Sequence, residues 1–175
     1  SSGARLPVFR SAGPLLEFRR ADVDGVRLLN SSGLPAGNHH SLQFVIDPKS
    51  PATSNQSLMR VGSRFYLYIE TGAGGGNNGW GFYEYATGSF VGRGDLSTGK
   101  QLLSFEFDDT TGLATLYVNN VQAGATATWT GSAWDGVVSL CSSGDGGSSN
   151  ADADIYEIAV LTSATTIATE DRAAL

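Results

Sequence analysis

Apolar and polar residues alternate along much of this chain, most clearly over residues 100–108. There Leu103, Phe105 and Phe107 fall on one side, and the residues between them are polar. A period of two is typical of a β-strand with one buried and one solvent-facing side. We therefore expect a strand over 100–108 whose three apolar residues face a core.

Turn-forming residues follow this segment and predict a meander of three strands. Residues 109–112 (DTTG) predict the first turn, and residues 113–118 predict the second strand. Asn119 and Asn120 predict a two-residue hairpin turn, because asparagine tolerates the positive φ that such turns require. The third strand is expected over 121–128.

The same alternation, in shorter form, predicts strands along the rest of the chain. We expect them at 15–18, 26–29, 42–46, 58–61, 65–70, 80–85, 89–93, 137–141 and 154–161. Turn signals separate these segments, and the chain holds 23 glycines and 5 prolines. Many short strands with regular turns indicate an all-β sandwich or barrel. A length of 175 residues fits one domain, so we expect a single domain over 1–175.

Only the C-terminal residues have a helical pattern. Thr169 is a candidate N-cap, Glu170 and Asp171 suit a first turn, and residues 172–175 continue the pattern. Because no C-cap signal follows, we expect the natural protein to be longer than this chain.

Charge excludes some classes of partner. The net charge is −6, and charged residues make up 16% of the chain, against about 25% in typical globular domains. Without a basic stripe, nucleic acid is not an expected partner. No segment approaches the roughly 20 apolar residues of a membrane span, so membrane insertion is not expected. The single cysteine, Cys141, excludes an intrachain disulfide and suits a buried strand position.

Residues 105–121 (FEFDDTTGLATLYVNNV) resemble the central hairpin of laminin G-like and concanavalin A-like domains. In that family a strand ending in Asp turns through Thr and Gly into a Leu-Tyr-Val-Asn-Gly turn, and Asn120 stands here in place of the last glycine. Residues 41–48 resemble an early strand of the family, and residues 154–160 its last strand. The resemblance implies a two-sheet antiparallel jelly-roll sandwich with a short C-terminal helix, reminiscent of phage virion versions of the fold.

A cluster of aromatic residues follows the glycine-rich segment 72–79 and is a candidate sugar-binding surface. An exposed ring can stack on a sugar while nearby amides bind its hydroxyl groups. Alternation puts Trp80 and Phe82 on one face and the tyrosines on the other, so one of the two sets packs the core. The candidate ligand-binding residues are Trp80, Tyr83, Tyr85, Asn77, Asn78 and Trp134.

Several oxygen-bearing residues near the last strand are candidate ligands for Ca²⁺, which prefers carboxylate and carbonyl oxygens. They are Asp145, Asn150, Asp152 and Asp154. Laminin G-like domains sometimes hold calcium at the sandwich rim, so Ca²⁺ is the candidate cofactor, although none is required. A solvated acidic loop is the alternative. His39 and His40 form a second, weaker metal candidate, and we expect them in a polar loop.

Asp152, Asp154 and Glu157 also match the spacing of the Glu-x-Asp-x-x-Glu motif of laminarinase-type glycosidases on this fold. Retaining glycosidases need two carboxyl groups about 5–5.5 Å apart. In a regular strand Glu157 would point away from the other two, so all three converge only if a β-bulge inserts a residue. The chain is also short for such an enzyme. We therefore expect no enzyme, and a glycosidase is the alternative.

These observations favour a non-catalytic recognition or assembly module. We expect it on a virion, as a decoration or host-attachment protein, or in another extracellular assembly, where it binds a glycan or a neighbouring protein surface. A secreted carbohydrate-binding module and a purely structural subunit are the alternatives. Residues 93–95 spell the cell-adhesion tripeptide Arg-Gly-Asp, which chance alone explains.

Overall fold

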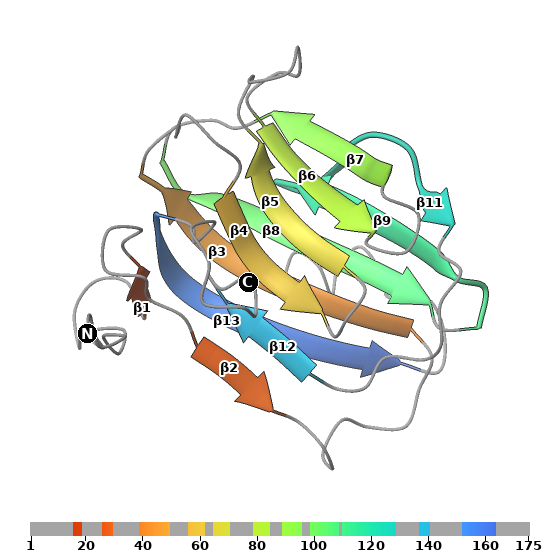
Figure 1. The fold of residues 1–175 in the computed structure, drawn as a ribbon, viewed down its shortest axis with the longest axis horizontal. Coiled ribbons are helices and arrows are strands. Elements are labelled where there is room, and N and C mark those ends of the chain that lie inside the picture. Colours follow the sequence, from red (N-terminus) through yellow and green to blue (C-terminus); the bar gives the residue numbers. More distant parts are fainter. Residues whose placement is uncertain are drawn as a thin grey trace.

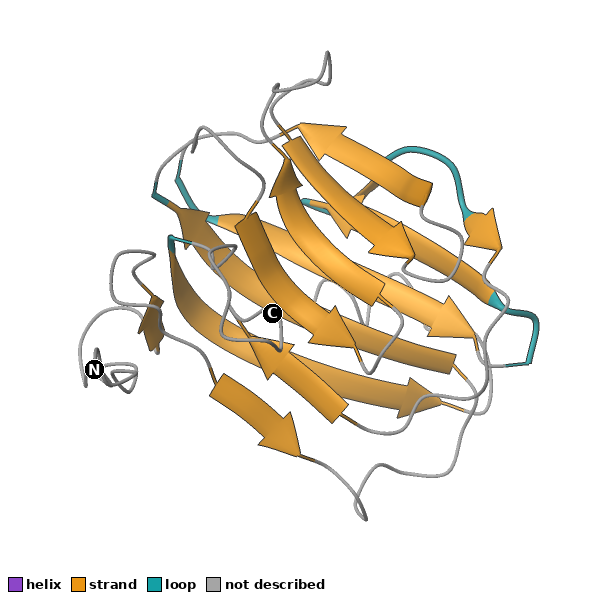
Figure 2. Ribbon diagram, in the orientation of Figure 1, coloured by secondary structure: helices purple, strands orange, loops and turns teal. Residues whose placement is uncertain are grey.

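A computed structural model of the chain describes residues 16–18, 26–29, 39–49, 56–61, 65–70, 79–84, 89–95, 99–108, 110–128, 137–140 and 152–163. All regular structure in these ranges is β-strand (Figure 2). Within them there is accordingly no helix long and apolar enough to cross a membrane. The helix predicted at 169–175 lies outside the described residues.

Two antiparallel sheets stack face to face and form a sandwich (Figure 1). The seven-stranded sheet has the order β1-β13-β3-β8-β9-β10, and β11 also pairs with β9. Its strands are β1 (Leu16–Phe18), β3 (His39–Pro48), β8 (Gln101–Asp108), β9 (Leu113–Val118), β10 (Val121–Gln122), β11 (Ala127–Thr128) and β13 (Ala153–Ser163).

The six-stranded sheet has the order β2-β12-β4-β5-β6-β7 and lies in front of the other sheet in Figure 1. Its strands are β2 (Val26–Leu29), β4 (Gln56–Val61), β5 (Phe65–Glu70), β6 (Gly79–Glu84), β7 (Ser89–Asp95) and β12 (Val137–Leu140). Strands far apart in the chain are neighbours in both sheets, as when β3 pairs with β13 from His39–Ser163 to Pro48–Ala153. The all-β, two-sheet prediction is confirmed.

The predicted strands all occur, most of them with bounds within two residues of the prediction, and two of them need a larger correction. Strand β3 begins at His39, so both histidines lie in a strand and the loop predicted for them is wrong. The ring of His40 packs 4.8 Å from that of Phe107 and continues the inward alternation of β3, which the polar appearance of histidine had concealed. The strand predicted over 121–128 is divided into β10 and β11, and Gly124 between them has a φ of 73°.

The core lies between the two sheets, and strands such as β3 and β8 contribute alternate residues to it. Among the described residues, sixteen apolar ones form it: Leu42, Phe44, Ile46, Leu58, Met59, Leu67, Ile69, Trp80, Leu103, Phe105, Phe107, Ala114, Leu116, Ala123, Ala153 and Ile155. Trp80 is the largest of these side chains and is fully buried. Its indole Nε1–H donates to Oε1 of Gln101 at 3.0 Å, and this hydrogen bond joins β6 of one sheet to β8 of the other.

The hairpin turn between β9 and β10 is held by its two asparagines. Asn119 and Asn120 have φ values of 51° and 64°, the left-handed pair of a type I′ turn. The side-chain Oδ1 of Asn119 also accepts a hydrogen bond from the backbone N–H of Leu102 at 2.9 Å. The backbone N–H of Asn119 donates a hydrogen bond to the carbonyl oxygen of Leu102 at 2.7 Å. Asn119 therefore fixes the hairpin against the neighbouring strand β8.

We expect Asn119→Ala to lower the free energy of unfolding by about 1–2 kcal/mol, because it removes that acceptor and places alanine at a left-handed φ. Asn120→Gly is the matched control, because glycine adopts this φ without strain, and its unfolding free energy should stay within about 0.5 kcal/mol of wild type or rise. Urea denaturation followed by circular dichroism measures both values. Equal effects of the two substitutions would contradict the proposed role of the Asn119 side chain.

Candidate functional site

The face of the seven-stranded sheet that is turned away from the core carries mostly polar side chains. Residues of β3 and β8 that alternate with the core positions share this face, since successive side chains of a strand point to opposite sides. Across the two strands the register pairs His39 with Asp108, Ser41 with Glu106, and Gln43 with Ser104. Ser41, Gln43 and Ser104 are buried despite lying on this face, and the Nε2 of Gln43 donates to the Oγ of Ser41 at 3.2 Å.

A hollow of about 250 Å³ opens on this outer face over β3, β8 and β9. Its lining combines two carboxylates, three threonine hydroxyl groups and a tyrosine ring, and its polar and apolar surfaces are of similar area. The described lining residues are His39, His40, Glu106, Phe107, Asp108, Thr111, Leu113, Thr115, Tyr117 and Thr126. Tyr117 is half-buried, and Leu113 is a large apolar residue that is exposed.

Asp108 is fixed at one end of the hollow by the turn that follows β8. Its Oδ1 accepts a hydrogen bond from the backbone N–H of Thr110, and its Oδ2 accepts one from the hydroxyl of Thr111, both at 2.8 Å. The imidazole Nδ1 of His39 lies 3.6 Å from the same Oδ2. Burial alone would raise the pKa of Asp108, but these hydrogen bonds and the charge of a protonated His39 together hold that pKa below its ordinary value. Asp108 therefore remains ionised at neutral pH.

Hydroxyl groups border the hollow on the side of β9. The Oγ1 atoms of Thr115 and Thr126 are 3.0 Å apart and share a hydrogen bond. The Nε2 of Gln122 donates to Thr126 at 3.3 Å and to the carbonyl oxygen of Gly124 at 3.1 Å. These contacts orient polar groups at the edge of the hollow, where a bound molecule would meet them.

The predicted aromatic site on β6 is corrected at Trp80. This residue has 0% exposure, lies opposite Ile69 on the core side of β5 and β6, and therefore offers no face to a ligand. Trp80 therefore packs the core, which is one of the two possibilities that the alternation over residues 80–85 left open. The register pairs Tyr83 with Tyr66 across β6 and β5. Asn77, Asn78, Tyr85, Trp134 and the side chain of Tyr83 lie outside the described residues.

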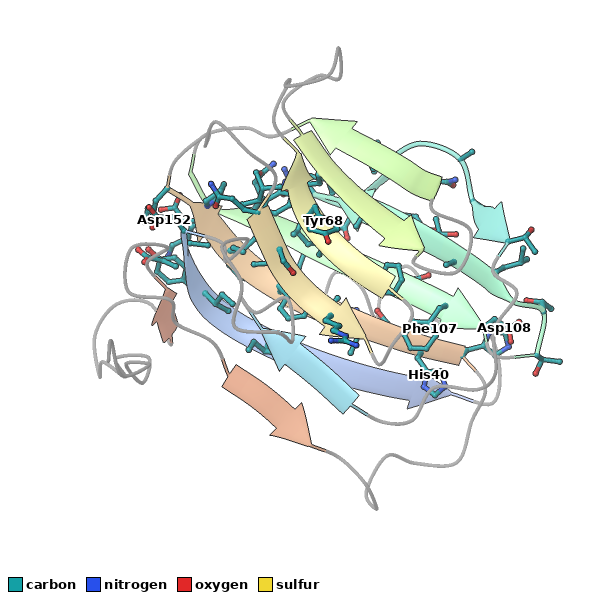
Figure 3. All side chains as sticks on the ribbon, viewed as in Figure 1. His40, Tyr68, Phe107, Asp108 and Asp152 are labelled. Carbon is teal, nitrogen blue, oxygen red and sulfur yellow. The ribbon has the colours of Figure 1, made fainter. Side chains whose placement is uncertain are left out.

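A second polar cluster lies at the opposite end of the sandwich, where β13 begins. Figure 3 shows Asp152 at this end, and Asp108 beside His40 and Phe107 at the other. The ammonium group of Lys49 lies 2.6 Å from Oδ2 of Asp47 and 2.9 Å from Oδ2 of Asp154, and so bridges the two carboxylates. These hydrogen bonds to Asp47 and Asp154 raise the pKa of Lys49 above its ordinary value, although partial burial opposes them.

The calcium prediction can be examined only in part, because Asp145 and Asn150 lie outside the described residues. The carboxylate of Asp154 is bound by Lys49, which already places a positive charge where a metal ion would supply one. The backbone N–H of Asp152 donates to Oε1 of Gln56 at 2.8 Å, and this bond ties the start of β13 to β4. In the ranges that the structure describes, no three His, Cys, Asp or Glu side chains are grouped so that they could hold a metal ion.

The β-bulge that the glycosidase alternative requires is present. The register of β13 against β3 passes from Ile155 to Glu157, so Tyr156 is the extra residue. Asp154 pairs with Asp47 and Glu157 with Val45, which puts both carboxylates on the outer face of the sheet. The ring of Tyr156 instead lies under the ammonium group of Lys100, 3.7 Å from its centroid. The carboxylate of Asp154 is engaged by Lys49, however, so this group has a structural role at the rim.

Apart from His39 and His40, which were a weak metal candidate, the residues of the hollow were not identified as a site from the sequence. The alternation over 100–108 does identify Glu106 and Asp108 as outward-facing. Their proximity to His39 and Tyr117 depends on how β3, β8 and β9 pair with one another. No local sequence pattern predicts that pairing.

No protein-family model matches the sequence, and no curated protein is significantly similar to it. Many solved structures nevertheless share its fold. A Bacteroides ovatus protein thought to bind carbohydrate superposes with a TM-score of 0.58 and 16% identity, over 81% of this chain and 43% of its own. The chain thus spans less than half the length of that protein.

Two further structures match over most of both chains. A heptameric SAP-like pentraxin from Limulus polyphemus has a TM-score of 0.61 and 14% identity, over 95% of this chain and 77% of its own. The CBM40 of the Ruminococcus gnavus IT-sialidase, solved with α2,3-sialyllactose bound, has a TM-score of 0.56 and 16% identity, over 84% of this chain and 93% of its own. The likenesses establish that this chain folds as a two-sheet jelly-roll sandwich.

Proposed function

We propose that this chain is a non-catalytic glycan-binding module that holds a saccharide in the hollow on the outer face of its seven-stranded sheet. The observation that carries the proposal is the lining of that hollow, in which carboxylates and hydroxyl groups surround the half-buried ring of Tyr117. Such a mixture of an apolar surface with a few directed polar groups is characteristic of small-ligand sites.

The chemistry of the lining suits a sugar. Saccharides present many hydroxyl groups, and a carboxylate such as Glu106 accepts strong, charge-assisted hydrogen bonds from them. The apolar faces of sugar rings can pack against an aromatic side chain or an aliphatic one, and Tyr117 and Leu113 supply both. A hollow of about 250 Å³ is of the size that suits a small ligand such as a short saccharide.

The structural comparisons support the same class of ligand. The Ruminococcus gnavus module has this fold and was solved with a bound oligosaccharide, and the Bacteroides ovatus protein is thought to bind carbohydrate. A non-catalytic role is supported by the position of Asp154, whose carboxylate binds Lys49 at the rim and lies at the other end of β3 from the hollow.

Screening the purified domain on a glycan array, followed by calorimetric titration of the strongest ligand, tests the proposal. We expect Tyr117→Ala to weaken binding at least about tenfold, or about 1.4 kcal/mol, because the ring forms part of the wall of the hollow. Tyr68→Ala is the matched control, since Tyr68 is also a half-buried tyrosine but lies on β5 of the other sheet. Its affinity should remain within about twofold of wild type.

Loss of binding in Tyr68→Ala alone would contradict the hollow as the site. It would favour the six-stranded sheet, where Tyr68 is paired with Gly81 and Tyr66 with Tyr83. The other sheet would then be the second candidate for the binding surface. Binding to no glycan at all would leave a structural subunit as the better description.

We further propose that this module forms part of a virion or of another extracellular assembly. The low content of charged residues supports it, as does the heptameric pentraxin, in which this fold forms part of a multi-subunit assembly. A neighbouring protein surface is then the alternative partner to a glycan, and Ca²⁺ remains the candidate cofactor.

A further inference from the structure

We infer that Ser104 binds one hydroxyl group of the saccharide and forms a buried floor of the hollow beside Tyr117. The inference rests on the proposed function and specifies its ligand: a saccharide with a free hydroxyl group next to the sugar ring that packs against Tyr117. Ser104 is not among the described lining residues, so the tyrosine side chain has to turn aside as the sugar enters. Changes of side-chain rotamer on binding are common.

The position of Ser104 in the sheet is the first step of the argument. The register places it between Gln43 on β3 and Tyr117 on β9, and directly opposed side chains have Cβ atoms about 5 Å apart. Ser104 is also two residues from Glu106 on β8, on the same face. Glu106 and Tyr117 line the hollow, and Ser104 is only 1% exposed. The serine therefore lies at the buried end of the polar surface that the hollow exposes.

The hydroxyl group of Ser104 has the chemistry that such a contact needs. Its Oγ is buried and has no hydrogen-bond partner among the described residues. A buried polar atom without a partner is unfavourable and uncommon in folded proteins. A serine hydroxyl donates one hydrogen bond and accepts others, and a sugar hydroxyl does the same, so the two groups are complementary. A sugar hydroxyl bound to Ser104 would satisfy in the complex a group that the protein alone leaves unsatisfied.

Ser57 provides a matched comparison on the other sheet. It is 0% exposed, its Oγ also has no hydrogen-bond partner among the described residues, and its cross-strand neighbour Tyr68 is half-buried. Ser57 thus has the same burial and bonding as Ser104, but it belongs to β4, whereas the hollow lies over β3, β8 and β9. Substituting each serine by alanine therefore separates a contact with the saccharide from a general effect of removing a buried hydroxyl group.

Ser104→Ala and Ser57→Ala are compared with wild type by urea denaturation and by calorimetric titration with the array glycan that binds wild type most tightly. We expect both variants to unfold at a urea midpoint equal to or above that of wild type, because alanine removes a buried hydroxyl group that has no partner. The affinity of Ser104→Ala should fall at least about fivefold, which corresponds to the loss of one hydrogen bond. The affinity of Ser57→Ala should stay within about twofold of wild type.

Monodeoxy derivatives of the same glycan, each lacking one hydroxyl group, identify the group that Ser104 binds. One derivative should bind wild type at least about fivefold more weakly than the parent glycan does. The same derivative should bind Ser104→Ala as tightly as the parent glycan binds this variant, because the two changes remove the same hydrogen bond and their effects do not add. Additive losses for every derivative would overturn the inference.

The remaining outcomes separate the inference from the function on which it rests. Unchanged affinity in Ser104→Ala, or a lower urea midpoint in that variant, would overturn the inference, and the proposed function would stand if Tyr117→Ala still weakens binding. Weaker binding in Ser57→Ala but not in Ser104→Ala would place the saccharide on the other sheet and overturn both. Binding of no array glycan would also overturn both.

Discussion

Replacing Trp80 with alanine is expected to lower the free energy of unfolding by about 3–5 kcal/mol, the range found when large aromatic side chains are removed from cores. The indole is fully buried between the sheets, so the substitution leaves a cavity that the surrounding strands cannot fill. It also deletes the hydrogen bond from Nε1 to Gln101, which joins the two sheets. Because whole domains are stable by only about 5–15 kcal/mol, this variant should be partly unfolded at 37 °C.

Trp80→Phe is the matched control, since it keeps most of the ring and removes the hydrogen bond. We expect it to cost about 1–3 kcal/mol, and thermal and urea denaturation followed by circular dichroism will measure both variants. The folded phenylalanine variant should bind glycan with unchanged affinity, because the indole lies in the core. Lost binding in a variant of full stability would place this ring at the ligand and contradict its position in the core.

Replacing Lys49 with methionine is expected to lower the free energy of unfolding by about 1–3 kcal/mol, between the values for exposed and buried ion pairs. The register places Asp47 directly opposite Asp154, and like charges in opposed positions of a sheet repel. Lys49 bridges them, and Asp154 is only 6% exposed, so it cannot recover full hydration when the lysine is removed. Methionine keeps the length of the side chain and removes only its charge and hydrogen bonds.

The contribution of Lys49 to the free energy of unfolding depends on pH in a definite direction. A lysine whose pKa is raised in the folded state contributes stability at every pH below its ordinary value, and that contribution is lost only as the pH rises through the raised pKa. The difference between wild type and Lys49→Met should therefore be constant from pH 7 to about 10, near the ordinary lysine pKa.

A double-mutant cycle provides the control for this ion bridge. Adding Asp154→Asn to Lys49→Met removes the repulsion and should restore about 1 kcal/mol or more, which the cycle reports as coupling between the two residues. Additive effects of the two substitutions would show that the bridge does not stabilise this rim.

The strands were predictable because burial on one face leaves a local signal. Strand β8 was expected over 100–108 and occupies Gln101–Asp108, since its three apolar residues alternate with polar ones. Strand β6 carries apolar residues on both faces, so alternation could not decide which set faced the core. The burial of Trp80 became evident only with the pairing of β6 and β5.

The candidate site was less predictable because it depends on contacts between distant segments. His39, Glu106 and Tyr117 belong to three strands, and their meeting requires the register of β3 with β8 and of β8 with β9. The bulge at Tyr156 was recognised only as a condition for one alternative, since a single inserted residue shifts the alternation by one position and has no motif of its own. The ion bridge of Lys49 likewise joins the end of β3 to the start of β13, across a hundred residues.

The pairing of β3 with β13 also sets a limit on when the domain can fold. Strand β3 lies between β8 and β13, and its partner on the β13 side is synthesised more than a hundred residues after it. At translation rates of about 5–20 residues per second, one edge of β3 remains unpaired for several seconds on the ribosome. Such a high contact order is typical of slowly folding β-sandwiches. The pairing of β3 is therefore completed only when β13 becomes available, and until then the nascent chain exposes the unpaired edge of β3.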